Sequence, residues 1–371
     1  AAHRFILKRG HLHEVKPPPG FLWSPLLSPG GRLRLLCEPL VGAKVDDEPE
    51  TIYDFACRRI GREAADMLVA PMVTGVYAGD AKQLSLAHCF PRMADMEREH
   101  GSLFRAMRAM RKSGKAAMGP GGTLHSLRRG MGSVPEAAAV RLGERLHLDT
   151  AVTAVQRDGS DYLVETVSGG QFRAPVVLVA APAYAAAHFL PPLGRDLASA
   201  LGAISYADVA VVCAGYARER LAHDLNGFGF LVPRREGLRT LGCLWSSSLF
   251  PDRAPEGHVL LRVMLGGALD GDVVNRSDGG LIDLVSREVH PLLGIDGAPD
   301  FMHIARWQPG IPQYHLGHGL RLRAIEHAED AHPGLIFAGN AYRGVGLNDC
   351  VASAHRAVGM AARKLGAEAP A

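Results

Sequence analysis

The chain has 371 residues, 47% of them hydrophobic and 21% charged, so it can bury a sizeable core, and its length fits about two domains. This composition excludes disordered and fibrous proteins. Its 41 basic and 38 acidic residues give a net charge of +3, which is too balanced for a protein that binds nucleic acid by neutralising phosphates.

Cysteine usage and apolar runs narrow the class of protein further. The six cysteines are scattered singly, with no Cys-x-x-Cys pair and no Cys/His spacing suited to zinc, which indicates a reduced compartment and no metal site. The longest apolar runs are too short or too interrupted to span a bilayer. We therefore expect a protein that is not integral to a membrane.

The first half of the chain opens with a strand-like stretch over residues 4–10 and then becomes helical. Asp47 can cap a helix whose apolar residues recur at helical spacing up to Gly61, and a second helix follows to about Val73. From Ser102 to Lys115, leucine, phenylalanine and methionine alternate with arginine and lysine as in a basic amphipathic helix. Such a helix either lies on an anionic membrane or packs its apolar face on the core.

From Thr150 the apolar period changes to two, which predicts β-hairpins with turns at Asp158-Gly159 and Gly169-Gly170, followed by a buried strand over 176–179. Beyond Leu190 the signals are mixed and predict an α+β lobe. It has strands at 207–214, 228–232, 240–245 and 259–265 and a helix around 281–293.

The C-terminal segment predicts a strand over 334–340, a glycine-bearing loop over 341–350 and a helix over 351–364. Strand, loop and helix start together place backbone N-H groups at a helix N-terminus, where an anion or a polarised ring can bind. On pattern alone this signal is only moderately specific, because many α/β connections contain glycines.

Seven blocks in fixed order give the sequence a resemblance to a known family. They are FACRRIG (55–61), GVYAGD (75–80) leading to LS (84–85) and CFP (89–91), GMGSVP (130–135), GFGFLVP (227–233), VMLGG (263–267), IPQY (311–314) with GH (317–318), and the loop at 339–350. On these residues the chain resembles the protoporphyrinogen oxidase family of haem biosynthesis, which belongs to the FAD-dependent, amine-oxidase-like flavoproteins. The resemblance covers nearly the whole chain.

One family feature is absent from these 371 residues: the G-x-G-x-x-G loop that cradles the FAD pyrophosphate at a helix N-terminus. The family carries this loop in an N-terminal βαβ unit. We therefore expect this chain to lack that unit and to bind FAD weakly.

The resemblance implies a set of substrate-binding residues. Arg4 takes the position of an arginine that binds a propionate of the tetrapyrrole, which is sensible because a guanidinium grips a carboxylate with two hydrogen bonds. Apolar side chains enclose the macrocycle, and glycines bring backbone close to it. The matching residues are Leu231, Leu244, Met264, Phe228, Gly75 and Gly229.

The resemblance also implies cofactor-binding residues. Val152 corresponds to the hairpin that passes the adenosine side of FAD, and Asn340, Val345, Gly346 and Leu347 correspond to the loop that approaches the flavin. Helix-start N-H groups there would stabilise the charge that builds up on the reduced flavin. No catalytic side chain is required, and we interpret Tyr314 and His318 as structural.

The fold implied is a combined α/β and α+β, two-lobed flavoprotein of the amine-oxidase type. It has a truncated start of both lobes (1–46), a helical insertion that binds membrane (47–117), a discontinuous FAD lobe (118–187 and 333–371) and a substrate lobe (188–332).

The function implied is the oxidation of protoporphyrinogen IX to protoporphyrin IX with FAD as cofactor and oxygen as acceptor. The expected partners are a tetrapyrrole, oxygen, a membrane surface and a second copy in a homodimer. The expected location is cytoplasmic and peripherally associated with a membrane, which is the bacterial cytoplasmic membrane, or the mitochondrial inner membrane if the protein is eukaryotic. Two alternatives stay open: oxidation of coproporphyrinogen, which would want more than one arginine at the site, and an inactive remnant that binds porphyrin without turnover.

Overall fold

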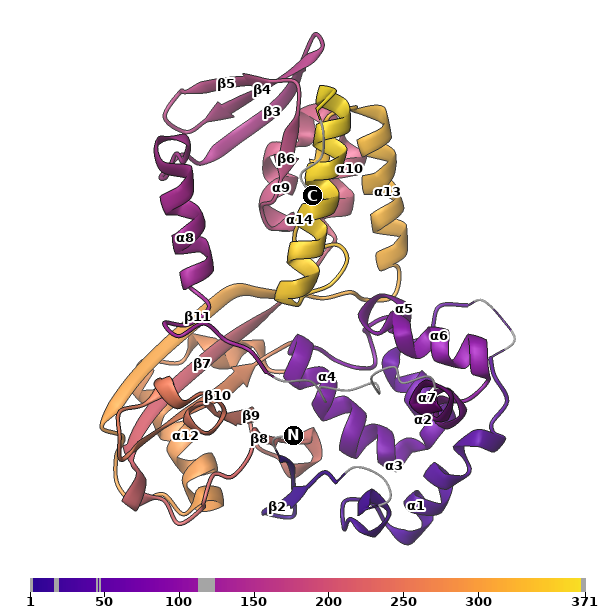
Figure 1. The fold of residues 1–371 in the computed structure, drawn as a ribbon, viewed down its shortest axis with the longest axis vertical. Helices are drawn as coiled ribbons and strands as arrows, with labels where there is room; N and C mark the ends of the chain where they lie inside the picture. Colours follow the sequence, from indigo (N-terminus) through magenta and orange to yellow (C-terminus); the bar gives the residue numbers. More distant parts are fainter. Residues whose placement is uncertain (1–2, 17–19, 45, 47, 113–123, 368–371) are drawn as a thin grey trace. The chain divides into compact units, whose positions relative to one another are not determined.

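The computed structural model describes residues 1–371 except 1–2, 17–19, 45, 47, 113–123 and 368–371 (Figure 1). The chain forms two compact units. Unit 1 contains residues 1–133 and 207–311, and unit 2 contains residues 134–206 and 312–371. The finer domain division expected from the sequence stays a prediction.

A seven-stranded sheet forms the centre of unit 1, with the strand order β11-β7-β10-β9-β8-β1-β2. Its strands are β1 (Arg4–Lys8), β2 (His11–Glu14), β7 (Tyr206–Ala217), β8 (Gly229–Leu231), β9 (Thr240–Trp245), β10 (His258–Gly266) and β11 (Phe301–Pro312). Strands β1 and β8 run parallel, whereas β8, β9, β10 and β7 pair antiparallel in that order.

One face of this sheet carries the main core of unit 1. Because successive side chains of a strand point to opposite faces, every second residue of β7, β9 and β10 enters one core. Helix α12 (Asp278–Leu293) covers that core. The core includes Leu7, Val212, Ala214, Phe230, Cys243, Trp245, Leu261, Val263 and Leu265 from the strands and Leu281, Leu284, Val285 and Val289 from α12. The alternate residues are therefore left to the opposite face.

The helical segment of unit 1 follows β2 in the chain. Its helices are η1 (Gly20–Trp23), α1 (Pro29–Leu36), η2 (Glu38–Leu40), α2 (Ile52–Ile60), α3 (Arg62–Ala64), η3 (Ala65–Val69), α4 (Ala70–Tyr77), α5 (Leu86–Cys89), α6 (Pro91–His100) and α7 (Leu103–Lys112). Thr51 caps α2 by accepting a hydrogen bond from the N-H of Asp54, and Gly61 ends the helix at φ +89°. In Figure 1, α4 lies beside β8 and β9, which it contacts.

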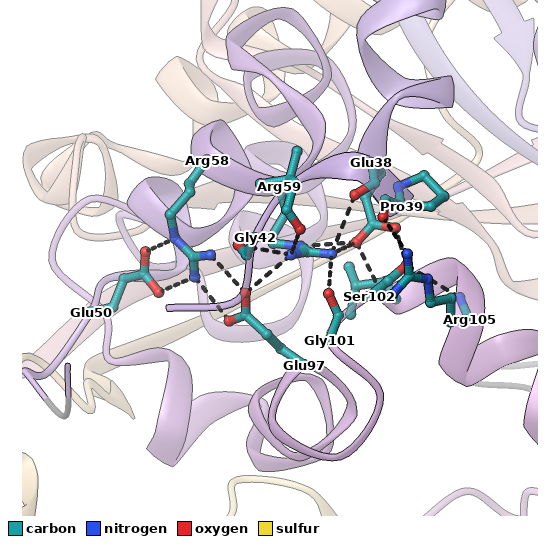
Figure 2. Close-up of polar contacts among 12 residues, drawn as sticks. Glu38, Pro39, Gly42, Glu50, Arg58, Arg59, Glu97, Gly101, Ser102 and Arg105 are labelled. Carbon is teal, nitrogen blue, oxygen red and sulfur yellow. Dashed lines mark hydrogen bonds and ion pairs between the residues drawn. The ribbon is translucent and has the colours of Figure 1, made fainter. Parts of the chain in front are cut away.

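A buried network of arginines and glutamates holds these helices together (Figure 2). The Arg59 side chain is fully buried and is ion-paired with Glu38, which is also fully buried, and with Glu97 at 3.2 Å. Arg58 bridges Glu97 at 2.6 Å and Glu50 at 2.9 Å. The pair Arg58-Arg59 on α2 therefore links η2, α6 and the segment that precedes α2.

Glu38 also closes the N-terminus of α7, although the two are far apart in sequence. Its carboxylate accepts hydrogen bonds from the Ser102 hydroxyl at 2.5 Å, the Leu103 N-H at 2.9 Å and the Phe104 N-H at 3.3 Å. Burial by itself raises the pKa of Glu38, but the hydrogen bonds from Ser102, Arg59, Leu103 and Phe104 outweigh it, so the pKa lies below its ordinary value. The carboxylate is therefore kept ionised at the helix N-terminus.

Unit 2 contains two small sheets and a set of helices. The strands β3 (Val152–Asp158), β4 (Asp161–Thr166) and β5 (Gln171–Ala174) form an antiparallel sheet. The strands β6 (Val177–Val179) and β12 (Leu335–Phe337) form a parallel pair. The helices are α8 (Ser133–Leu142), η4 (Gly143–Arg145), α9 (Ala183–Phe189), η5 (Pro191–Leu193), α10 (Arg195–Gly202), α13 (His318–Ala331) and α14 (Leu347–Leu365). Its core packs β3, β4, β6 and β12 against α9, α10 and α13.

Most of the predicted elements are confirmed, including the hairpins after Thr150, the four strands of the α+β lobe and the C-terminal strand, loop and helix. The sequence analysis missed β11. The cap expected at Asp47 is wrong, because α2 begins at Ile52 and Thr51 caps it. The last three residues of the predicted helix over 102–115 lie outside the described residues. Within the part of the chain that the structure describes, no helix is both long enough and apolar enough to cross a bilayer.

Candidate functional site

Three half-buried apolar side chains, Leu231, Leu244 and Met264, share the face of the unit 1 sheet opposite α12, and we call them the apolar face. They come from the adjacent strands β8, β9 and β10, where Leu244 pairs with Gly229 and Met264 pairs with Gly242. Their neighbours along each strand belong to the buried core. The structure thus brings together, on one surface, three residues that the resemblance assigns to the substrate.

Helix α4 approaches this face through Gly75. A Cβ atom at position 75 would lie only 2.8 Å from Leu231 Cδ2, so a larger residue there would push the leucine aside. Met264 packs beside Ala78, which follows α4. The small residues of α4 and its end thus let the helix pack close to the apolar face.

Gly229 allows β8 and β9 to meet at one end of the apolar face. Its φ of +132° is rarely adopted by other residues, and a Cβ atom would lie 2.0 Å from the carbonyl oxygen of Cys243. Only glycine fits this close approach of two backbones. The implied role of Gly229 in offering backbone near a ligand stays a prediction, since this geometry explains the glycine by the contact between β8 and β9.

Arg4 lies at the same end of the apolar face, because β1 pairs with β8 and places Arg4 opposite Gly229. The Arg4 guanidinium carbon lies 5.3 Å from the centroid of the Phe228 ring, a cation–π distance. Burial lowers the pKa of Arg4 from its ordinary value, which means that the guanidinium is partly removed from water. A partly dehydrated guanidinium on an aromatic ring is well placed to bind a carboxylate.

In unit 2, Val152 lines a cavity of about 680 Å³ formed by β3, β4, β6 and α9. The lining is apolar except for Thr153 and His188, and its members are Ala151, Val152, Thr153, Val155, Val164, Val177, Leu178, Val179, Ala180, Ala181, Ala185, His188 and Phe189. Gly339 reaches one part of this lining, because a Cβ atom there would lie 3.8 Å from the Ala180 carbonyl oxygen. Asn340, Val345, Gly346 and Leu347 are not among the residues that line the cavity.

The loop that contains Asn340 is held by a buried tyrosine. The Tyr314 hydroxyl donates to the Asn340 carbonyl at 2.5 Å and accepts from the Gly344 N-H at 2.8 Å. The Tyr314 ring stacks on His318 at 4.3 Å between centroids, and His318 Nε2 lies 3.0 Å from the Tyr342 carbonyl oxygen. Both side chains therefore fix the loop, which supports our structural interpretation of them.

The start of α14 carries an acidic residue that the sequence analysis did not select. Asp349 accepts a hydrogen bond from the Gly346 N-H at 3.1 Å, and it leaves no room for a Cβ at Gly344, which would lie 2.5 Å from the aspartate Cβ. The Gly346 N-H is thus engaged within the chain. The aspartate three residues after a glycine at a helix start was the available signal.

The candidate site therefore consists of two separate groups of residues. The seven residues assigned to the substrate all lie in unit 1, and the five assigned to the cofactor all lie in unit 2.

Comparison with known proteins finds consistent relatives. Residues 1–360 match the family described as flavin containing amine oxidoreductase. The chain is 34% identical to the chloroplastic protoporphyrinogen oxidase of rice, over 95% of this chain and 71% of the relative. It is 31% identical to the coproporphyrinogen III oxidase of Bacillus subtilis, over 91% of this chain and 73% of the relative. A solved structure from Exiguobacterium, described as a candidate protoporphyrinogen oxidase, superposes with a TM-score of 0.82 at 27% identity, covering 98% of this chain and 80% of that one.

Proposed function

The chain belongs to the flavin-containing amine oxidoreductases and, within them, to the porphyrinogen oxidases, and from this premise we propose that it oxidises a porphyrinogen to the corresponding porphyrin. The observation that carries the proposal is the apolar face of unit 1 with Arg4 at its end. A porphyrinogen is a broad apolar ring that carries carboxylates at its edge. An apolar surface bordered by a guanidinium matches that chemistry.

The residues of unit 1 bind and orient the substrate in this proposal. Arg4 holds a propionate, and Leu231, Leu244 and Met264 contact the ring and exclude water from it. Conversion of a porphyrinogen to a porphyrin removes six hydrogen atoms, and three molecules of oxygen take them up as three of hydrogen peroxide. No side chain is needed as a nucleophile or as a carrier of the electrons.

The cofactor is a flavin, as the family shows, and FAD supplies an acceptor for two electrons at a time when bound. The apolar cavity beside Val152 suits the adenosine side. The first turn of α14 offers N-H groups without intrahelical partners, which suits the end of the flavin that gains negative charge. No G-x-G-x-x-G loop for the diphosphate occurs in the sequence. The residues present therefore fit the adenosine and flavin ends of FAD better than the diphosphate between them.

The membrane surface, the homodimer and the cytoplasmic membrane-associated location stay part of the proposal. The basic residues Arg105, Arg108 and Arg111 of α7 are exposed, which supports contact with an anionic membrane. Leu40 is 82% exposed, and its neighbour Pro39 accepts a hydrogen bond from Arg105. An exposed apolar side chain beside basic residues is the pattern that an interfacial contact uses.

A Leu244→Asp variant tests the proposed role of the apolar face. We expect at least about a 10-fold loss of protoporphyrin affinity in a fluorescence titration, because a carboxylate would have to be dehydrated against the ring. Leu244 is half-buried at the surface of the sheet, so the fold should tolerate the change, and circular dichroism checks this.

The matched control is Val167→Asp, which places the same charge at an exposed turn of unit 2. It should bind protoporphyrin like the parent. Equal affinity of the Leu244→Asp variant and the parent would contradict the proposed substrate site.

A further inference from the structure

Arg262 of β10 lies on the same sheet face as the apolar face, at the end opposite Arg4. In the register of the sheet, Arg4 pairs with Gly229, Gly229 with Leu244, and Leu244 with Arg262, so the four residues form one row across four strands. Arg4 and Arg262 occupy the two ends of that row. Leu244 lies between them.

Arg262 forms a hydrogen bond with the Cys213 side chain, which gives it a polar partner but no counter-charge among the described residues. It lies in the interior strand β10, where it pairs with Cys213 of β7. Met264, two residues further along β10, points to the same face. Other arginines of unit 1, such as Arg59, Arg239 and Arg306, are ion-paired with carboxylates of the chain. Among the residues that the structure describes, no carboxylate forms an ion pair with Arg262, which is exposed.

The spacing of the two arginines selects among porphyrinogens. Three strand-to-strand steps of about 4.8 Å separate their backbones by roughly 14 Å, a span that suits opposite edges of one macrocycle. Protoporphyrinogen carries its two propionates on neighbouring pyrroles, and its opposite edge carries vinyl groups. Coproporphyrinogen carries a propionate on each of its four pyrroles. Only the second substrate presents a carboxylate to both ends of the row.

We propose that Arg262 binds a propionate at the edge of the macrocycle opposite Arg4, and that the chain prefers a porphyrinogen with carboxylates on opposite edges, as in coproporphyrinogen. This inference rests on the proposed function. The sequence resemblance favoured protoporphyrinogen as the substrate, because it identified only one arginine, Arg4. The register of the sheet adds a second arginine, Arg262, and therefore favours coproporphyrinogen. If the vinyl edge of protoporphyrinogen lay on Arg262, the guanidinium would lose its hydrogen bonds to water and gain none from the vinyl groups.

Porphyrin binding to the purified chain tests the proposal without any need for bound flavin. Coproporphyrin III and protoporphyrin IX are titrated separately into the parent and into Arg262→Gln, and porphyrin fluorescence reports binding. We expect the variant to lose roughly 10-fold in affinity for coproporphyrin, the size of one charge-assisted hydrogen bond, while its affinity for protoporphyrin stays the same or rises. Arg262→Lys should fall between the two, because it keeps the charge and loses the bidentate geometry.

The control is Arg287→Gln, which removes an exposed arginine from α12 on the other side of the sheet and should leave both affinities unchanged. The deciding quantity is the ratio of the two affinities, which a general loss of structure would not shift selectively. An unchanged ratio in Arg262→Gln, with both porphyrins bound by the parent, would overturn this proposal alone. A parent that binds neither porphyrin would overturn the proposed function and this proposal with it.

Discussion

At the scale of single residues, the proposed substrate site depends on a cation held where water is already partly excluded. Arg4 stacks on Phe228, and burial lowers its pKa, so part of the dehydration that a carboxylate ligand requires has taken place before binding. In the proposed site, Arg4 contacts a propionate far from the hydrogens that leave the ring. It therefore acts equally on the bound substrate and on the transition state.

Arg4→Ala should raise KM for the porphyrinogen by about 10-fold or more and change kcat little, because a uniform contact mainly sets substrate affinity. Steady-state rates of porphyrin formation, with FAD supplied in excess, measure both parameters. Arg287→Ala on α12 serves as the control. Equal KM values in Arg4→Ala and the parent would remove Arg4 from the propionate site.

Single residues also mark the limit of sequence reasoning. The resemblance placed Gly75, Leu231 and Met264 together, and the structure brings Leu231 and Met264 to one sheet face with Gly75 of α4 packed against Leu231. Arg262 escaped notice because its relation to Arg4 depends on the register of four strands, the first of which precedes the other three by more than 200 residues. Register is set by side-chain burial and turns, which no local pattern in β10 reveals.

At the scale of elements, the helical segment of unit 1 is organised around buried charge. Glu38, Arg59 and Glu97 form hydrogen bonds with one another and with backbone groups in place of the water that they lose on burial. These bonds offset the free-energy cost of burying the charges only while all three residues are present. The sequence could not reveal this network, because Glu38 caps a helix that begins 65 residues later. Strand β11 was missed for a related reason: its Pro309 argues against an interior strand, whereas β11 lies at the edge of the sheet.

Glu38→Gln should lower the free energy of unfolding by about 3 kcal/mol at neutral pH, because the buried Arg59 would lose its fully buried counter-charge and keep only the more distant Glu97. Urea denaturation followed by circular dichroism measures the change. Glu99→Gln, at an exposed position of the neighbouring helix α6, should change stability by less than about 0.5 kcal/mol.

The same pair gives a pH test. The folded-state pKa of Glu38 lies below the ordinary value of 4.5, so its stabilisation is fully present above pH 4.5 and is lost as the pH falls through the folded-state pKa. The stability gap between the parent and Glu38→Gln should therefore narrow on acidification. A gap that stays constant below pH 4.5 would mean that the Glu38 carboxylate is not held ionised by its partners.

Helix α7 should bind anionic vesicles through its exposed arginines, while its buried Leu103 and Ala106 attach it to unit 1. Changing Arg105, Arg108 and Arg111 together to Gln should weaken vesicle binding by roughly 100-fold, at about 1 kcal/mol per arginine, and added salt should weaken binding of the parent. The triple Lys variant keeps the charge and is the matched control. Equal flotation of the Gln variant and the parent would show that α7 serves packing alone.

At the scale of the whole molecule, the substrate residues and the cofactor residues belong to two units that each have their own core. The sequence predicted the combined α/β and α+β character and the C-terminal strand, loop and helix, since those signals are local. The pairing of β6 with β12 could not be predicted from the sequence, because these two parallel strands are more than 150 residues apart in the chain. Without a glycine-rich phosphate loop, these 371 residues should purify colourless and need FAD in excess.

The most direct test of the whole account is porphyrin formation by the purified chain. Coproporphyrinogen and protoporphyrinogen are supplied in air, with and without excess FAD, and the fluorescence of the porphyrin product is followed against spontaneous oxidation in buffer. The account predicts formation above the spontaneous rate only with FAD. Formation should be slower in Leu244→Asp, and faster for coproporphyrinogen than for protoporphyrinogen at low substrate concentration. Rates equal to spontaneous oxidation for both substrates, at every FAD concentration, would contradict it.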